Sequence, residues 1–265
     1  MQIEKVIKRL KLYLFDMDGT LYLGDQLFPF TLQLLDKIRS SGGRYMFMTN
    51  NSSKSVQAYI DKLSKMGISA AYDDFITSSQ ATAYYLKKHY PNAGLYVCGT
   101  ESLKEELRSQ NFSVTEDLNA VECIVMGFDT ELNFKKLHDI SYMLCTRDLP
   151  YVATNPDYVC PTEFGSVPDC GSICDMIFNA TGKRPVVIGK PEPLMPLLAM
   201  EKTGYKSEET AVIGDRIYTD IKCGIQAGAV TILVMSGETT DAILSDSPDK
   251  PDIVLQNAGE LIEFM

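Results

Sequence analysis

The sequence of 265 residues is poor in histidine and in positive charge. It has two histidines, His89 and His138, which leaves almost no room for a histidine-rich zinc site or a histidine-ligated iron centre. Lysine and arginine number 25 against 35 aspartates and glutamates, a formal charge of −10. So acidic a chain argues against broad binding to nucleic acids or anionic membranes, because both require basic patches. Any metal is therefore expected to be a hard cation held by oxygen ligands.

The sequence also lacks long apolar runs and a regular pattern of cysteines. No run approaches the roughly 20 apolar residues that cross a bilayer, and Met1 to Lys11 mixes charged and apolar residues, unlike the core of a secretory signal. The seven cysteines show no repeated pairing pattern, and a chain of this length does not need disulfides to fold. We therefore expect a cytoplasmic protein without membrane partners.

Strand-like and helix-like segments alternate along the chain. Residues 12–15 and 45–48 are short apolar runs, as expected of strands buried on both faces. Residues 32–38 and 56–66 carry apolar side chains at helical spacing, and glycines follow both segments. This order predicts an α/β fold with a doubly wound parallel sheet.

The same alternation returns near the end, with strands expected at 211–213 and 230–234 around a helix at 217–227. Between these halves lies a segment with strands and helices of its own, expected at 95–98, 102–109, 123–126, 133–145, 151–153 and 172–181. We therefore predict a core made of residues 1–79 and 185–265, interrupted by an inserted α/β cap at 80–184, and both sizes are usual for domains.

Polar side chains follow four of the predicted strands, where parallel sheets bind their ligands. They are Asp16 and Asp18 after the first strand, Thr49-Asn50-Asn51 after the second, Gly189-Lys190-Pro191 after Val186–Ile188, and Gly214-Asp215-Arg216 with Asp220 after 211–213. Each group alone is also ordinary turn or helix-cap sequence. Four such groups at successive strand ends, expected in one sheet, indicate a functional site.

The charges of this site favour phosphate chemistry. Four aspartates repel one another unless a divalent cation joins them, and an all-oxygen site favours Mg²⁺. The cation, Lys190 and the Thr49 hydroxyl suit a phosphate dianion, as do the backbone amides after Asn51. One carboxylate could then attack phosphorus, while a second protonates the departing alcohol and later activates water.

The same residues resemble the haloacid dehalogenase (HAD) superfamily. Its four motifs are matched in order as Asp-Met-Asp-Gly-Thr, Thr-Asn-Asn, Gly-Lys-Pro and Gly-Asp-Arg with a following Thr-Asp. The Thr-Asn-Asn motif and the α/β insert between the second and third motifs resemble subclass IIA, which includes NagD and 4-nitrophenylphosphatases. Ala153-Thr154-Asn155-Pro156-Asp157 and Ser236-Gly237 extend the likeness over nearly the whole chain.

The resemblance implies a role for each matched residue. Asp16 would be the nucleophile and a metal ligand, and Asp18 the general acid and base, binding the metal through its backbone carbonyl. Thr49 and Lys190 would hold the phosphoryl group. Asn50 and Asn51 would lie near that group, Asp215 would complete the metal shell, and Asp220 would orient the metal or Lys190. Arg216 is as well explained as a solvated arginine at a helix start.

The resemblance implies a Mg²⁺-dependent phosphatase that works through an aspartyl-phosphate. Dehalogenases of the superfamily need neither a general acid nor a metal, and its P-type ATPases need membrane helices. Phosphomutases typically have small helical caps. A phosphotransferase using the same aspartyl-phosphate stays open as an alternative, as does a non-catalytic ligand sensor, although a sensor usually loses the nucleophile or the acid.

The cap sequence leaves the substrate undefined. In the subclass a loop before the last cap helix supplies substrate contacts, and here residues 155–171 correspond to it. Its candidate contacts are Asn155, Asp157, Tyr158, Cys160 and Glu163. Pyridoxal-phosphate phosphatases place a histidine near the position of Cys160, and this chain has none there. A small phosphorylated metabolite, such as a sugar phosphate or nucleotide, is expected, with 4-nitrophenyl phosphate as an artificial substrate. A homodimer through the cap is implied by resemblance alone.

Overall fold

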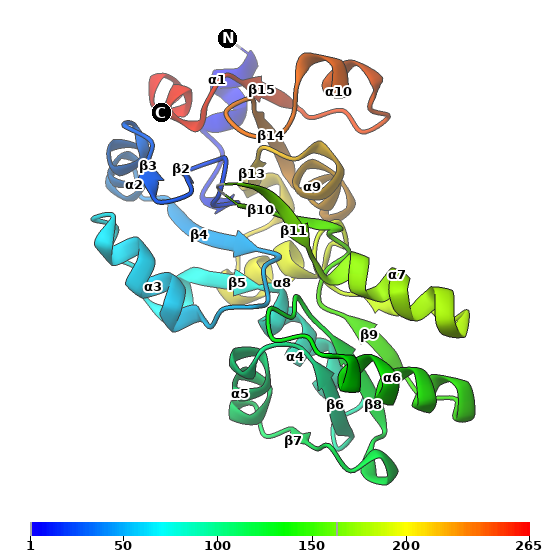
Figure 1. Ribbon diagram of the computed structural model, residues 1–265. Coiled ribbons are helices and arrows are strands. Elements are labelled where there is room, and N and C mark those ends of the chain that lie inside the picture. The colour runs from blue at the N-terminus through cyan, green and yellow to red at the C-terminus, as the bar shows by residue number, and fades with distance from the viewer. Residues whose placement is uncertain (1, 163) are drawn as a thin grey trace. The chain divides into compact units, whose positions relative to one another are not determined.

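The protein was analysed as a computed structural model, which describes residues 2–162 and 164–265. These residues form two compact units (Figure 1). The first unit extends to Thr49, resumes at Gln57–Ile76 and closes with Lys190–Met265; the second consists of Asn50–Val56 and Thr77–Gly189. The insert predicted at 80–184 therefore falls inside the second unit.

The first unit is built on a six-stranded sheet with the order β15-β14-β13-β1-β4-β5. Its strands are β1 (Leu12–Phe15), β4 (Arg44–Thr49), β5 (Phe75–Thr77), β13 (Thr210–Gly214), β14 (Val230–Val234) and β15 (Ile253–Leu255). β1 pairs in parallel with both β4 and β13, and β14 pairs in parallel with β13 and β15. All four residues of β1 are buried, which explains why the strand reads as an unbroken apolar run.

Helices lie on both sides of this sheet, as α2 and α9 show in Figure 1. The helices of the first unit are α1 (Gln2–Ile7), α2 (Thr31–Ser40), α3 (Val56–Lys65), α8 (Leu194–Thr203), α9 (Lys222–Ala227) and α10 (Asp241–Asp246). A short hairpin, β2 (Tyr22–Leu23) with β3 (Gln26–Leu27), follows β1. α2 ends just before Gly42, whose φ of +80° is the left-handed conformation that glycine adopts without strain.

The second unit has a five-stranded parallel sheet with the order β12-β9-β8-β6-β7. Its strands are β6 (Gly94–Cys98), β7 (Ser113–Val114), β8 (Cys123–Met126), β9 (Tyr151–Ala153) and β12 (Val186–Val187), and its helices are α4 (Ser78–His89), α5 (Glu101–Ser109), α6 (Phe134–Thr146) and α7 (Cys170–Thr181). An antiparallel hairpin of β10 (Val159–Thr162) and β11 (Gly165–Pro168) precedes α7. Several helices begin with a side-chain cap. At the start of α4, for example, the hydroxyl of Thr77 accepts a hydrogen bond from the backbone N–H of Gln80.

The sequence prediction is confirmed for the fold class and for most elements, with two corrections. The strand expected at Val186–Ile188 is not part of the first sheet, because β12 pairs with β9 in the second. Strand partners are chosen by contacts distant in sequence, so an apolar run alone could not assign this one.

The second correction concerns the helix predicted at 217–227. It begins as one π-helical stretch, Ile217–Ile221, and becomes α-helical only at α9. A π-helical turn is wider than an α-helical one and occurs frequently at functional sites. Among the described residues, no helix is long and apolar enough to span a membrane.

Candidate active site

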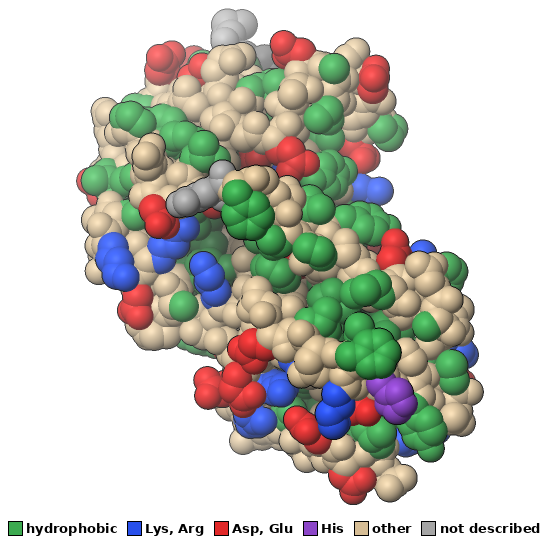
Figure 2. All heavy atoms as spheres, in the orientation of Figure 1, with side chains coloured by type: hydrophobic (Ala, Val, Ile, Leu, Met, Phe, Trp, Pro, Cys, Tyr) green, Lys and Arg blue, Asp and Glu red, His purple; other side chains and the backbone are tan. Residues whose placement is uncertain are grey.

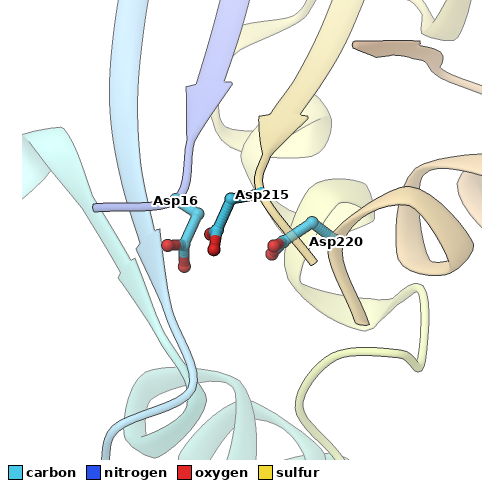
Figure 3. Close-up of side chains that lie close together, drawn as sticks. All are labelled: Asp16, Asp215 and Asp220. Atoms are coloured by element: carbon cyan, nitrogen blue, oxygen red, sulfur yellow. The ribbon is translucent and has the colours of Figure 1, made fainter. Parts of the chain in front are cut away.

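Three aspartates converge at the carboxyl ends of two neighbouring strands of the first unit. Asp16 follows β1 directly and Asp215 follows β13, while Asp220 belongs to the π-helical stretch after β13 (Figure 3). One carboxylate oxygen from each aspartate lies within 4.8 Å of those of the other two. The sheet thus collects residues that are about 200 positions apart in the chain.

Lys190 lies inside this cluster and brings a positive charge to the three carboxylates. Its Nζ donates to Asp16 Oδ1 at 2.6 Å and to Asp220 Oδ1 at 2.6 Å, and it lies 3.4 Å from the carbonyl oxygen of Met48 in β4. The side chain of Lys190 is 3% exposed and that of Asp220 is 1% exposed. This buried ammonium therefore links the ends of β1 and β4 to the π-helical stretch.

The backbone around the cluster approaches the carboxylates of Asp215 and Asp220 so closely that there is no room for a side chain. A Cβ at Gly214 would lie 2.3 Å from Cγ of Asp220, and a Cβ at Gly237 would lie 2.0 Å from Oδ2 of Asp215. Gly19 has a φ of +84°, and a Cβ there would lie 2.6 Å from the same oxygen. Glycine at these positions is thus a steric condition for the carboxylate cluster.

A loop after β14 fixes Asp215, although none of its residues was predicted to have a functional role. The backbone N–H of Glu238 donates to Asp215 Oδ2 at 2.7 Å, and Ser236 Oγ donates to the carbonyl of Gly19 at 2.7 Å. Ser236-Gly237 carries a recognisable sequence signal, but the contact of Glu238 uses its backbone and could not be read from the residue type. Arg216 forms an ion pair with Glu238 at 2.8 Å, consistent with a solvated arginine beside the site.

Burial and the repulsion of neighbouring carboxylates raise the pKa values of Asp16 and Asp215. Burial, opposed by Lys190 and reinforced by Asp220 and Asp215, raises the pKa of Asp16 to about 8. Burial and the charge of Asp220 raise the pKa of Asp215 to about 6, against the Glu238 N–H and Arg216, which lower it. Burial disfavours the charged form of Lys190, yet Asp16 and Asp220 outweigh it and raise the pKa of the ammonium.

The donor set fits a hard divalent cation. Its ligand atoms are carboxylate oxygens, as Mg²⁺ and Ca²⁺ prefer. Asp215 Oδ1 is buried and has no hydrogen-bond partner among the residues that the structure describes. A buried carboxylate oxygen without a donor is costly, and a cation next to it would remove that cost.

The chain is similar to known proteins along nearly its whole length. Residues 13–113 match the family described as haloacid dehalogenase-like hydrolase, and residues 187–261 match a HAD-hydrolase-like family. The acid sugar phosphatase of Staphylococcus epidermidis is 34% identical over 234 residues, 88% of this chain and 90% of that protein. The chain belongs to the haloacid dehalogenase superfamily.

Solved structures place it more narrowly within this superfamily. A 4-nitrophenylphosphatase from Thermotoga maritima superposes with a TM-score of 0.93 at 39% identity, covering 97% of this chain and 98% of that one. A putative nagD protein superposes with a TM-score of 0.91 at 35% identity, covering 97% and 99%. A glycerol phosphate phosphatase from Mycobacterium tuberculosis, in complex with calcium, has a TM-score of 0.89 at 27% identity, covering 97% and 76%. The chain is thus a phosphoric monoester hydrolase of subclass IIA.

The structure places the other predicted residues of this phosphatase less centrally. Thr49 ends β4 in the first unit and is 8% exposed. The side chain of Asp18 is exposed and is not among the three clustered carboxylates; its Oδ1 accepts from the N–H of Gly24, in the turn between β2 and β3, at 3.5 Å. Asn50 and Asn51 belong to the second unit. Asn51 Oδ1 accepts the N–H and the hydroxyl of Ser53 and so shapes that loop.

The candidate substrate contacts of the cap loop divide into two groups. Asn155 and Asp157 are buried in a polar network of the second unit. Tyr158 is 59% exposed, next to the β10–β11 hairpin that contains the half-buried Cys160. Glu163 lies outside the described residues. Tyr158 and Cys160 are thus at least partly exposed, whereas Asn155 and Asp157 are buried.

Proposed function

We propose that this protein is a Mg²⁺-dependent phosphatase that hydrolyses a small phosphorylated metabolite through an aspartyl-phosphate on Asp16. The observation that carries the proposal is the cluster itself. Two of its three carboxylates, those of Asp16 and Asp220, lie 2.6 Å from one buried ammonium, and one oxygen of Asp215 lacks a donor among the described residues. Such an excess of negative charge around a lysine favours a site that takes up a cation together with a phosphate.

Asp16, the backbone carbonyl of Asp18 and the carboxylate of Asp215 would hold Mg²⁺, and Asp220 would support the site through Lys190. When bound, the cation would lower the charge of the phosphate and of the cluster, which favours attack by an anion. Thr49 and Lys190 would orient the phosphoryl group. Asn50 and Asn51, which follow Thr49 in the chain, are proposed as phosphate-binding residues from the sequence motif.

In the first step a carboxylate oxygen of Asp16 forms a bond to phosphorus, and the ester P–O bond breaks. The departing alkoxide takes a proton from Asp18, whose exposed side chain can exchange protons with solvent. In the second step water attacks the phosphorus of the acyl phosphate and gives a proton to Asp18. The P–O bond to Asp16 then breaks, which restores the carboxylate and releases inorganic phosphate.

The substrate class is proposed from the relatives and the cap. The names of the relatives cite sugar phosphates, 4-nitrophenyl phosphate and glycerol phosphate, so a sugar phosphate or another small phosphomonoester, such as a nucleotide, is the class to test first. A homodimer through the cap stays a prediction, and light scattering of the purified protein would test it.

The test is hydrolysis of 4-nitrophenyl phosphate with Mg²⁺, with Ca²⁺ and with EDTA. We expect activity with Mg²⁺, little with Ca²⁺ and none with EDTA, and Asp16→Asn should lose at least about 1,000-fold in kcat. Asp148→Asn, at a fully exposed position of the second unit, is the matched control. Equal rates with Mg²⁺ and EDTA, or an active Asp16→Asn variant, would contradict the proposal.

The alternative of a phosphotransferase is tested in the same assay by balancing the products. For a hydrolase, inorganic phosphate equals 4-nitrophenol when alcohols or sugars are added as acceptors. A shortfall of phosphate matched by a new phosphorylated product would favour transfer.

A further inference from the structure

The segment Asn50–Val56 follows the proposed phosphate ligand Thr49, yet it belongs to the second unit. Ser78 Oγ donates to the carbonyl of Asn50 at 2.6 Å, and Thr100 Oγ1 donates to the carbonyl of Ser53 at 3.1 Å. Ser52 is fully buried; its Oγ accepts from the N–H of Phe128 at 2.9 Å and lies 2.9 Å from Thr154 Oγ1. These contacts attach the segment to the unit along its length.

The segment is attached at the position where sheets of this kind bind their ligands. In chain order the five strands β6, β7, β8, β9 and β12 lie as 2-1-3-4-5, so the direction of winding changes between β6 and β8. Doubly wound sheets of this order bind their ligands beyond the carboxyl ends of those two strands. Thr100 and Phe128 follow these strand ends and both bond to the segment. The chain's own segment therefore occupies the position of a ligand.

Asn50 is fixed in this position by a buried carboxylate. Its Nδ2 donates to Asp157 Oδ2 at 2.8 Å, and both residues are 9% exposed. A Cβ at Gly189 would lie 2.6 Å from Asn50 Oδ1, so the other end of the amide packs against a backbone that must be glycine. The carboxylate and the glycine together define one orientation of the amide.

Asp157 is itself held by a network of buried hydrogen bonds. Asn155 Nδ2 donates to the same oxygen of Asp157 at 2.9 Å and to Asp169 Oδ1 at 3.1 Å. Asn155 is fully buried and Asp169 is 4% exposed, and Asp169 caps the start of α7. Side-chain amides thus donate hydrogen bonds to these buried carboxylates, and such bonds are stronger in the protein interior than in water.

We propose that Asp157 is a positioning residue that acts through Asn50, and that it is not a contact to the leaving group. This inference rests on the proposed function, because the proposed function is what places Asn50 beside the phosphate. Asp157 would hold the segment after Thr49 in one conformation, so that phosphate binds to a loop already ordered by the second unit. The role predicts an effect that is the same for every phosphomonoester.

Kinetics with two leaving groups test this directly. For Asp157→Ala we expect kcat/KM to fall roughly tenfold or more, by the same factor with 4-nitrophenyl phosphate and with glycerol phosphate. Asp157→Asn should recover part of the loss, because its side-chain oxygen can still accept from Asn50. In an Asn50→Ala background, Asp157→Ala should add less than about twofold. A loss that differs strongly between the substrates, or that persists without Asn50, would overturn the proposal.

Hydrogen exchange of the peptide that contains residues 50–56 tests the same point without activity. Asp157→Ala should speed exchange there by roughly tenfold, whereas Asp175→Asn, on the surface of α7, should not change it. Unchanged exchange in Asp157→Ala would also overturn the proposal. If wild-type protein hydrolyses neither ester, the proposed function fails, and the exchange experiment still decides whether Asp157 orders the segment.

Discussion

Each unit of this phosphatase contains a cluster of buried aspartates, and the two clusters are neutralised differently. In the first unit Asp16 and Asp220 share the ammonium of Lys190, while Asp215 accepts the backbone N–H of Glu238 and has one oxygen without a donor among the described residues. In the second unit Asp157 and Asp169 receive the neutral amides of Asn50 and Asn155. Buried carboxylates are thus compatible with either role, and an excess of carboxylates over donors, which leaves one oxygen of Asp215 without a partner among the described residues, sets the reactive site apart from the structural network.

The second unit also carries an apolar surface that lies outside both clusters. Figure 2 shows hydrophobic side chains gathered over α6 and α7, where Phe134 is 79% exposed and Tyr142 is 53% exposed. A hollow of about 580 Å³ lies among them. It holds none of the aspartates of either cluster, so we assign it no part in the chemistry.

The largest effect should follow from removing the ammonium of the first cluster. Lys190→Met leaves Asp16 and Asp220 without their partner, so we expect loss of measurable activity and a free energy of unfolding lower by about 3–5 kcal/mol. The urea midpoint and the rate with 4-nitrophenyl phosphate measure both.

Lys136→Met is the matched control in the second unit, because Lys136 pairs with the buried Asp129 at 2.6 Å. It should lower the urea midpoint but keep activity within about threefold. Equal loss of activity in both variants would remove the proposed difference between the units.

The next effect concerns the cation. Mg²⁺ at 100 times its Kd should stabilise the wild-type protein by about 2.7 kcal/mol, seen as a rise of the thermal midpoint. Asp215→Asn should abolish most of this rise, because it removes a charged ligand, whereas Asp169→Asn should retain it. A Mg²⁺ effect that survives in Asp215→Asn would place the cation elsewhere.

A smaller effect should come from the amide that joins the carboxylates of the second unit. Asn155→Ala removes a donor from both Asp157 and Asp169 and should lower the free energy of unfolding by about 1–3 kcal/mol. The Mg²⁺-dependent rise in the thermal midpoint should remain. If the urea midpoint does not change, the amide network contributes nothing to stability, and the contrast between the clusters is weaker than the distances indicate.

The last effect is a dependence on pH. Asp16 and Asp215 have raised pKa values, about 8 and about 6 against an ordinary 3.8. Each binds its proton more tightly in the folded protein than in the unfolded chain. The free energy of unfolding of the metal-free protein should therefore fall as pH rises from about 4 to 8.

Mg²⁺ replaces the protons that these carboxyls would otherwise hold, so its stabilising effect should grow over the same pH range. Thermal midpoints at pH 5 and pH 8, with Mg²⁺ and with EDTA, measure this difference. A Mg²⁺ effect that is equal at both pH values would show that proton release is not linked to binding.

The sequence by itself determined the local elements and the identity of the central residues. An unbroken apolar run such as Leu12–Phe15 predicts a buried strand because both of its faces are covered. The polar residues that follow such runs, Asp16, Thr49 and Asp215, could be predicted as a site because the carboxyl ends of parallel strands meet at one edge. These inferences need only periodicity and position along the chain.

The tertiary structure alone decided which strands pair and which donors meet the carboxylates. It assigned β12 to the second sheet, brought the backbone of Glu238 to Asp215, and joined Asn50 to Asp157 across 107 positions. None of these contacts has a local signal, because a backbone N–H has no residue type and an amide can serve a ligand or a neighbour equally well. Only the packing of distant segments selects between those uses.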